Sequence, residues 1–176
     1  RMAATVPVTT RSYFSSLTIL HIALTTGQVI FGLVGFTVKL ISEDKPMPLS
    51  PETLHILQYL IPGLALLSIG ASQVLFSSRI KALKELSSSA AQYKGYRSAC
   101  ILRYALLEGP SLIALVVFLL SYNYLFLAVP ALIVLVFIAI RPTKKALLQH
   151  LQPPYDQQML LEDPDAVLYE EGLPDN

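Results

Sequence analysis

Charged residues are scarce in this sequence of 176 residues, where Lys, Arg, Asp and Glu together make up 14%. Soluble globular proteins carry about 25%. Tryptophan is absent, and Cys100 is the only cysteine. Cys100 therefore has no partner for a disulfide within the chain, and we expect it to pack as a small apolar residue.

Sequence patterns that carry catalysis or cofactor binding are also missing. The chain has no glycine loop for a phosphate, no nucleophile paired with a base, and no His, Cys or carboxylate cluster at metal-ligand spacing. It has no basic block with interleaved aromatic residues either. We therefore expect a protein that is not an enzyme, holds no metal or other cofactor, and does not bind nucleic acid.

The missing charge leaves four long apolar runs, at residues 17–38, 56–76, 101–121 and 125–140. A helix needs about 20 apolar residues to cross the hydrocarbon core of a bilayer. Strict period-two alternation is absent from the runs, so helices are favoured over strands. We expect an all-α polytopic membrane protein, with a four-helix transmembrane bundle of two hairpins over residues 17–152. It would lie between an N-terminal segment, 1–16, and a C-terminal tail, 153–176.

Lysine and arginine are distributed unevenly between the connecting segments. The loop 77–100 holds five of them: Arg79, Lys81, Lys84, Lys94 and Arg97. The segments on the opposite side hold only Lys39 and Lys45, together with Glu43, Asp44 and Glu52. The positive-inside rule then puts both termini and the loop 77–100 in the cytoplasm, and the loop 46–51 outside.

Local signals predict where two helices begin. Ser50, Pro51 and Glu52 combine an N-cap residue, a first-turn proline and a first-turn acid, so a helix should start there. The run 87–89 consists of three serines and predicts a turn, after which residues 94–103 should extend the third apolar helix into the cytoplasm.

Glu108 is the main candidate for function, because it is a carboxyl group inside the third apolar run. A carboxylate at the centre of a bilayer costs about 2.5–3.5 kcal/mol. Pro110 has no N–H and frees the carbonyl of Leu106. Tyr104 and Ser111 lie four residues before and three after Glu108, at helical spacing. Such a site could bind a proton or a small monovalent cation, or it could hold helices together by hydrogen bonds with Glu108 neutral; a site for a lipid or small ligand is a third reading.

Other apolar runs offer partners at similar depth. In the first run, Thr25 and Gln28 share a helix face with His21, and Gly32 and Gly35 continue that face and allow close helix approach. In the second run, the polar residues for helix packing are Ser68, Ser72 and Gln73. We expect Glu108 to face these helices rather than lipid, since an unpaired carboxyl group is costly there.

The tail 153–176 carries seven acidic residues and no basic one. Its four prolines argue against a long helix, and its apolar residues suggest docking rather than a solvated tail; the candidates are Met159, Leu160, Leu161, Leu168 and Tyr169. Exposed charge pairs contribute only about 0.2–1 kcal/mol each. We therefore expect apolar contacts to hold the tail in a cytoplasmic groove, on this chain or, slightly favoured, on a neighbour.

Two stretches resemble the rotor proteolipids, the c-type subunits of rotary ATPases. Residues 26–36 (TGQVIFGLVGF) are similar to their Thr-Gln-Gly helix, and residues 106–117 (LLEGPSLIALVV) to the helix around the ion-binding carboxylate. The resemblance implies Glu108 as ion carrier and Gln28 as supporting ligand. Residues 101–108 and 141–144 also resemble small bacterial four-helix membrane proteins, which implies the bacterial inner membrane but no function.

Together these features predict a small integral membrane protein that acts as a non-catalytic subunit or oligomeric module built around a polar intramembrane site at Glu108. Its partners would be the lipid bilayer and a second copy or other membrane subunits. The alternative is a protein that conducts a proton or monovalent cation, or couples its movement, through Glu108.

Overall fold

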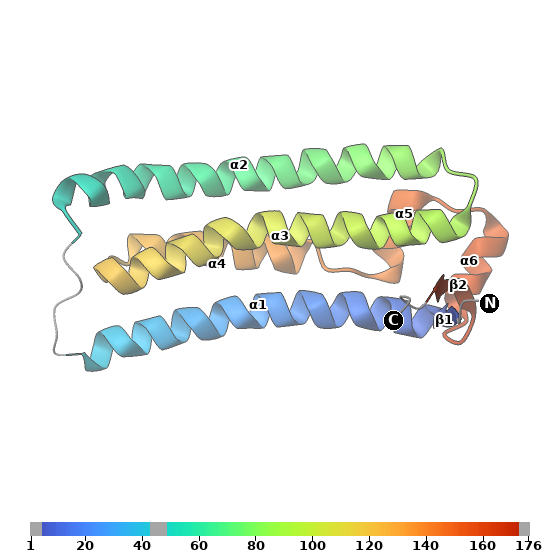
Figure 1. Cartoon of the computed structure of the whole chain (residues 1–176), viewed down its shortest axis with the longest axis horizontal. Helices are drawn as coiled ribbons and strands as arrows, with labels where there is room; N and C mark the ends of the chain where they lie inside the picture. The colour runs from blue at the N-terminus through green and yellow to red at the C-terminus, as the bar shows by residue number, and fades with distance from the viewer. Residues whose placement is uncertain (1–4, 43–48, 173–176) are drawn as a thin grey trace. The chain divides into compact units, whose positions relative to one another are not determined.

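The structure is a computed structural model that describes residues 5–42 and 49–172. Within these ranges the chain forms six helices and two short strands (Figure 1). In chain order they are β1 (Thr5–Thr9), α1 (Thr10–Ile41), α2 (Pro51–Lys84), α3 (Ser89–Ser121), α4 (Leu125–Ala139), α5 (Lys144–Leu151), α6 (Tyr155–Glu162) and β2 (Val167–Gly172). The predicted helical fold is confirmed, but the sequence did not predict the pairing of β1 with β2.

Three helices, α1, α2 and α3, are long and apolar enough to cross a membrane. A fourth span exists only if α4 and α5 are counted together as one broken span. With 15 residues, α4 is about 22 Å long, which is shorter than the ~30 Å hydrocarbon core. These three to four candidate spans are compatible with the predicted multi-pass membrane protein.

The predicted helix starts agree with the hydrogen bonds at the ends of α2 and α3. Ser50 Oγ accepts a hydrogen bond from the backbone N–H of Thr53 at 3.2 Å, as an N-cap does, and Pro51 is the first residue of α2. Ser88 Oγ accepts one from the N–H of Ala91 at 3.4 Å, just before α3 begins. The loop positions 46–48 lie outside the described residues, so the structure does not describe the prolines there.

The chain divides into two compact units. Unit 1 comprises residues 1–20, 76–100 and 142–176, and unit 2 comprises residues 21–75 and 101–141. The core of unit 1 is rich in tyrosine and leucine: Tyr13, Leu17, Tyr93, Tyr96, Leu147 and Leu161. The apolar core of unit 2 is formed by buried residues of α2, α3 and α4: Ile61, Ala65, Leu107, Leu115, Phe118, Phe126, Ile133 and Phe137.

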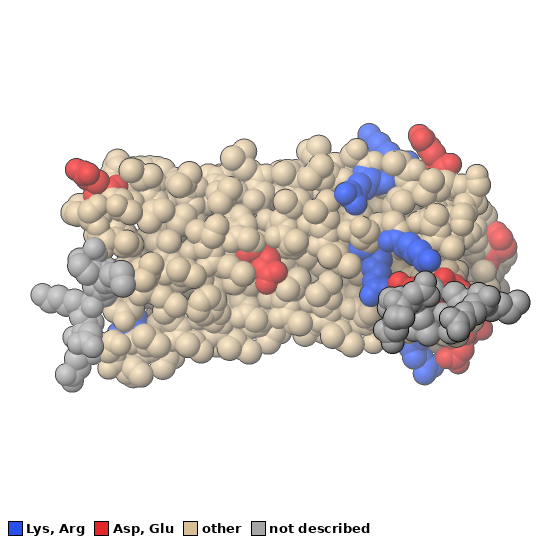
Figure 2. Space-filling model, viewed as in Figure 1, with Lys and Arg blue, Asp and Glu red and all other residues tan. Residues whose placement is uncertain are grey.

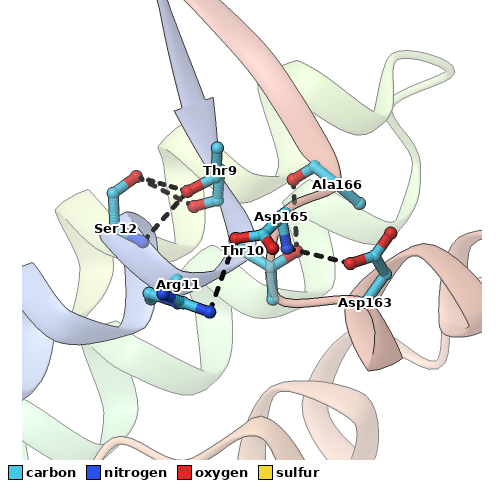
Figure 3. A network of polar contacts seen from close by, with 7 residues as sticks. All are labelled: Thr9, Thr10, Arg11, Ser12, Asp163, Asp165 and Ala166. Carbon is cyan, nitrogen blue, oxygen red and sulfur yellow. Dashed lines mark hydrogen bonds and ion pairs between the residues drawn. The ribbon is translucent and has the colours of Figure 1, made fainter.

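In unit 1 the two ends of the chain form an antiparallel pair, in which Thr5 lies opposite Gly172 and Thr9 opposite Val167. The pairing continues into the first turn of α1, where the N–H of Thr10 donates to Ala166 O at 3.0 Å and the N–H of Arg11 to Pro164 O at 2.9 Å. Figure 3 shows this junction, with Arg11 beside Asp165. The first N–H groups of a helix have no partner within it, so the tail supplies acceptors that α1 needs.

Candidate intramembrane site

Glu108 lies at the border between a buried and an exposed face of α3. Its helical neighbours Tyr104 and Ser111 are 1% and 0% exposed. Ala105 and Leu112, which are also one turn away, are exposed, and Glu108 itself is half-buried. The helices of this chain therefore enclose Glu108 only partly.

Among the residues that the structure describes, Glu108 forms no hydrogen bond and no ion pair. Several side chains expected near it hydrogen-bond elsewhere. Thr25 Oγ1 donates to the carbonyl of His21 at 2.8 Å, and Ser72 Oγ donates to the carbonyl of Ile69 at 2.8 Å, each within its own helix. Two of the sequence-predicted partners, Gln28 and Ser111, are joined to each other by a hydrogen bond.

The pair formed by Gln28 and Ser111 joins α1 to α3. Ser111 Oγ donates a hydrogen bond to Gln28 Oε1 at 2.5 Å, and the two residues are 0% and 2% exposed. The amide nitrogen of Gln28, Nε2, is buried and has no hydrogen-bond partner in the described part of the chain. A buried, unpaired amide donor costs about 1–3 kcal/mol, so this pair is only half satisfied.

An aromatic cluster in unit 2 involves His21, which the sequence left without a role. Its Nε2 lies 2.8 Å from the carbonyl oxygen of Phe137 in α4, and its ring meets that of Tyr104 edge-on, with centroids 5.4 Å apart. Tyr104 in turn stacks on Phe137 at 5.5 Å. Tyr104 of α3 thus contacts aromatic rings of both α1 and α4. The spacing of His21, Thr25 and Gln28 on one face was the only sequence signal for this cluster.

Two glycines of α1 face α3 closely. A Cβ atom added at Gly35 would lie 3.0 Å from Leu119 Cδ2, and one added at Gly32 would lie 3.5 Å from Leu115 Cδ2. Small residues at such positions let membrane helices approach each other.

The polar residues of α2 make different contacts. Gln73 Oε1 accepts a hydrogen bond from Arg103 Nη2 of α3 at 2.6 Å. Ser72 is buried, and Ser68 is half-buried. Arg103 of α3 is therefore joined to α2 by a hydrogen bond with Gln73.

The tail residues divide into buried and exposed ones. Leu161, Leu168 and Tyr169 are 1%, 9% and 6% exposed, whereas Met159 and Leu160 are 50% and 47% exposed. The ring of Tyr169 lies edge-on to Tyr13, with centroids 6.4 Å apart. These three residues are therefore buried within unit 1 of the same chain.

Charge contributes little to this docking. Figure 2 shows basic and acidic side chains close together over unit 1. In the described ranges, however, the only ion pair joins Arg11 to Asp165 at 3.5 Å, and both side chains are at least 70% exposed. Lys94 Nζ donates to the carbonyl of Glu170 at 3.4 Å and lies 4.9 Å from the ring centroid of Tyr169, so it contacts the backbone and a ring rather than an acid.

No group of three or more His, Cys, Asp or Glu that could hold a metal ion occurs within residues 5–42 and 49–172. Compared with known proteins, the chain matches no family model, no curated protein and no solved structure. In a helix that is long and apolar enough to span a membrane, the described residues offer a carboxyl group without a polar partner, together with a half-satisfied pair of an amide and a hydroxyl.

Proposed function

We propose that this chain is a non-catalytic, homo-oligomeric module of the bacterial inner membrane, assembled around Glu108. In this proposal the apolar segments cross the bilayer four times as two hairpins, with both termini and the segment 77–100 in the cytoplasm; that segment holds the end of α2, the turn and the start of α3. The presence of three to four helices that are long and apolar enough to span a membrane supports the membrane location.

The observation that carries the proposal is the lack of any polar partner for Glu108 in the described chain. An unpaired carboxyl group facing hydrocarbon is costly, so a second polar group is expected to reach it from outside the chain. A protonated carboxyl group has one donor and free acceptor positions, so the same group of a twofold-related copy satisfies both. For this reason we favour a second copy over an unrelated subunit.

The surface around Glu108 is suited to helix packing. Residues one and two turns away on the same side of α3 are apolar or small and exposed: Ile101, Ala105, Leu112 and Val116. Such a stripe would bury its side chains against the same stripe of another copy, while the carboxyl groups meet in its middle.

Disulfide cross-linking tests this interface directly, because Cys100 is the only native cysteine. In a Cys100→Ala background, Leu112→Cys should give a cross-linked dimer in native membranes. The matched control is Leu67→Cys, on α2, where the native side chain is 73% exposed. Equal cross-linking at both positions, or none at Leu112→Cys, would argue against an interface at Glu108.

A second candidate function is the movement or coupling of a proton or monovalent cation through Glu108. It is favoured by Pro110, which lies inside α3 and frees the carbonyl of Leu106 close to the carboxyl group. Flux into liposomes separates the two candidates. If the protein carries ions, the wild type should show flux and Glu108→Gln should abolish it. If the carboxyl group is purely structural, neither the wild type nor Glu108→Gln should show flux.

A further inference from the structure

A groove of about 320 Å³ lies in unit 2, lined by parts of α1, α3 and α4. Among the described residues that line it, Gln28 is the only polar one. The other lining residues are apolar, and those that matter below are Gly32, Phe36, Leu115, Pro130 and Ala131. The groove is thus an apolar space with a single polar side chain, and its volume lies at the lower end of the range for small-molecule sites, about 300–1,000 Å³.

The polar side chain in the groove has an unused hydrogen-bonding atom. Gln28 is 2% exposed, its Oε1 accepts from Ser111, and its Nε2 has no partner in the described chain. Exchanging the amide oxygen and nitrogen would leave the oxygen unpaired instead, so one atom stays unsatisfied in either orientation. Nε2 is itself buried, so a molecule in the groove reaches it only when the amide turns about its last side-chain bond, a torsion with broad preferences.

The depth of Gln28 restricts what can pair with it. Gln28 is 11 residues from Leu17 and 10 from Val38, the ends of the first apolar run. At 1.5 Å per residue it lies about 15 Å from each end, near the middle of the bilayer. Phospholipid head groups stay at the interface, and a charged group is excluded by its cost at this depth. The missing partner must therefore be an uncharged polar group attached to a molecule that dissolves in hydrocarbon.

We propose that the groove binds the ring of a lipid-soluble quinone, with a ring carbonyl oxygen accepting a hydrogen bond from Gln28. A quinone ring is uncharged and flat, and it carries acceptor oxygens on an otherwise apolar body. The aromatic ring of Phe36 offers a stacking surface, and Pro130 contributes no backbone donor that would compete with Gln28. The tail of the quinone remains in the bilayer.

The absence of tryptophan makes binding measurable with one added reporter. Phe36→Trp puts a fluorophore in the groove, and ubiquinone-2 added to nanodiscs should quench it along a saturable curve. The control reporter is Ile30→Trp, whose native side chain is 54% exposed on α1 and does not line the groove. There, quenching should rise in proportion to the quinone in the bilayer, without saturation.

Two further variants in the Phe36→Trp background test the details of the site. Gln28→Met keeps the length of the side chain and removes the amide, and it should weaken the apparent Kd about tenfold. Gly32→Leu should abolish saturable quenching by filling the groove. Its matched control is Gly27→Leu, on the same helix, where an added Cβ would have no neighbour within 4 Å. This control should bind ubiquinone-2 as tightly as the parent.

If Gly32→Leu does not fold, Ala131→Leu fills the groove from α4, with the exposed Ala128→Leu as control. Non-saturable quenching at both reporters would overturn the proposal, and so would saturable quenching that Gln28→Met leaves unchanged. If squalene, a hydrocarbon without oxygen, competed with ubiquinone-2 on equal terms, the groove would be a site for apolar chains only, and the proposal would be wrong. A disulfide between two copies of Ala131→Cys, in a Cys100→Ala background, would show that a second copy occupies the groove instead.

Discussion

Ser111 of α3 donates a hydrogen bond to Gln28 of α1 at 2.5 Å, and both residues are almost completely buried. This contact fixes the rotation of the two helices about their axes at one level, because each side chain needs the other. The sequence analysis grouped both residues with Glu108, but in the structure they hydrogen-bond to each other and not to Glu108.

A double-mutant cycle tests this contact. Ser111→Ala should lower the free energy of unfolding by about 1–3 kcal/mol, because it leaves Oε1 of Gln28 unpaired as well, and Gln28→Met should lower it by less, because it also removes the unpaired Nε2. The double variant should lose less than the sum, with a coupling energy of about 0.5–1.5 kcal/mol, as measured for hydrogen bonds between membrane helices. Unfolding in mixed micelles gives the four values. Strict additivity would mean that the two side chains do not interact.

The close approach at Gly35 predicts a difference between two glycines of α1. Gly35→Leu should destabilise the protein by about 1–3 kcal/mol, because an added Cβ would already lie 3.0 Å from Leu119. Gly27→Leu should change stability by less than about 0.5 kcal/mol, because its added Cβ meets open space. The midpoints of thermal unfolding in the same detergent make the comparison. A larger loss at Gly27 than at Gly35 would contradict the packing of α1 on α3.

Much of the fold could be predicted because long apolar helices leave a local signal. The apolar runs, the cap at Ser50 and the turn before Ser89 depend on residues close in sequence, and the structure contains helices in these places. The pairing of β1 with β2 joins residues about 160 positions apart, and neither strand has an alternating pattern strong enough to show it. The hydrogen bond from Ser111 to Gln28 was also out of reach, because periodicity gives the face of a helix but not the neighbour that it meets.

Docking of the tail should depend on its buried apolar residues and not on its charges. Tyr169→Ala should lower the free energy of unfolding of unit 1 by about 3–5 kcal/mol, since Tyr169 is 6% exposed and packs against Tyr13. Arg11→Ala should cost less than about 1 kcal/mol, because its ion pair with Asp165 is exposed.

Hydrogen exchange of the β2 amides measures both effects on the tail. The Tyr169 variant should exchange fast, and the Arg11 variant should exchange like the parent. Truncation after Gln152 should leave membrane insertion intact, because the apolar helices α1 to α4 remain. Fast exchange in the Arg11 variant, with slow exchange in the Tyr169 variant, would mean that charge and not apolar contact holds the tail in place.

The distribution of Lys and Arg predicts which side of the membrane each loop faces. In the Cys100→Ala background, Leu49→Cys should react with an impermeant maleimide added outside intact cells, and Ser88→Cys should react only after the cells are opened. Leu49 and Ser88 both belong to the described ranges and precede α2 and α3. The opposite pattern of labelling would invert the topology and place the tail outside the cell.

The role of Glu108 in assembly is tested most directly by the mass of the protein released from nanodiscs and measured by native mass spectrometry. The wild-type chain should appear as a dimer or larger oligomer. Glu108→Leu should appear mainly as a monomer, whereas Glu108→Gln, whose amide is also both donor and acceptor, should keep the oligomer. The control Glu52→Leu changes an exposed acid in the first turn of α2 and should not alter the mass. A monomeric wild type, or an oligomer that Glu108→Leu leaves intact, would contradict the proposed assembly through Glu108.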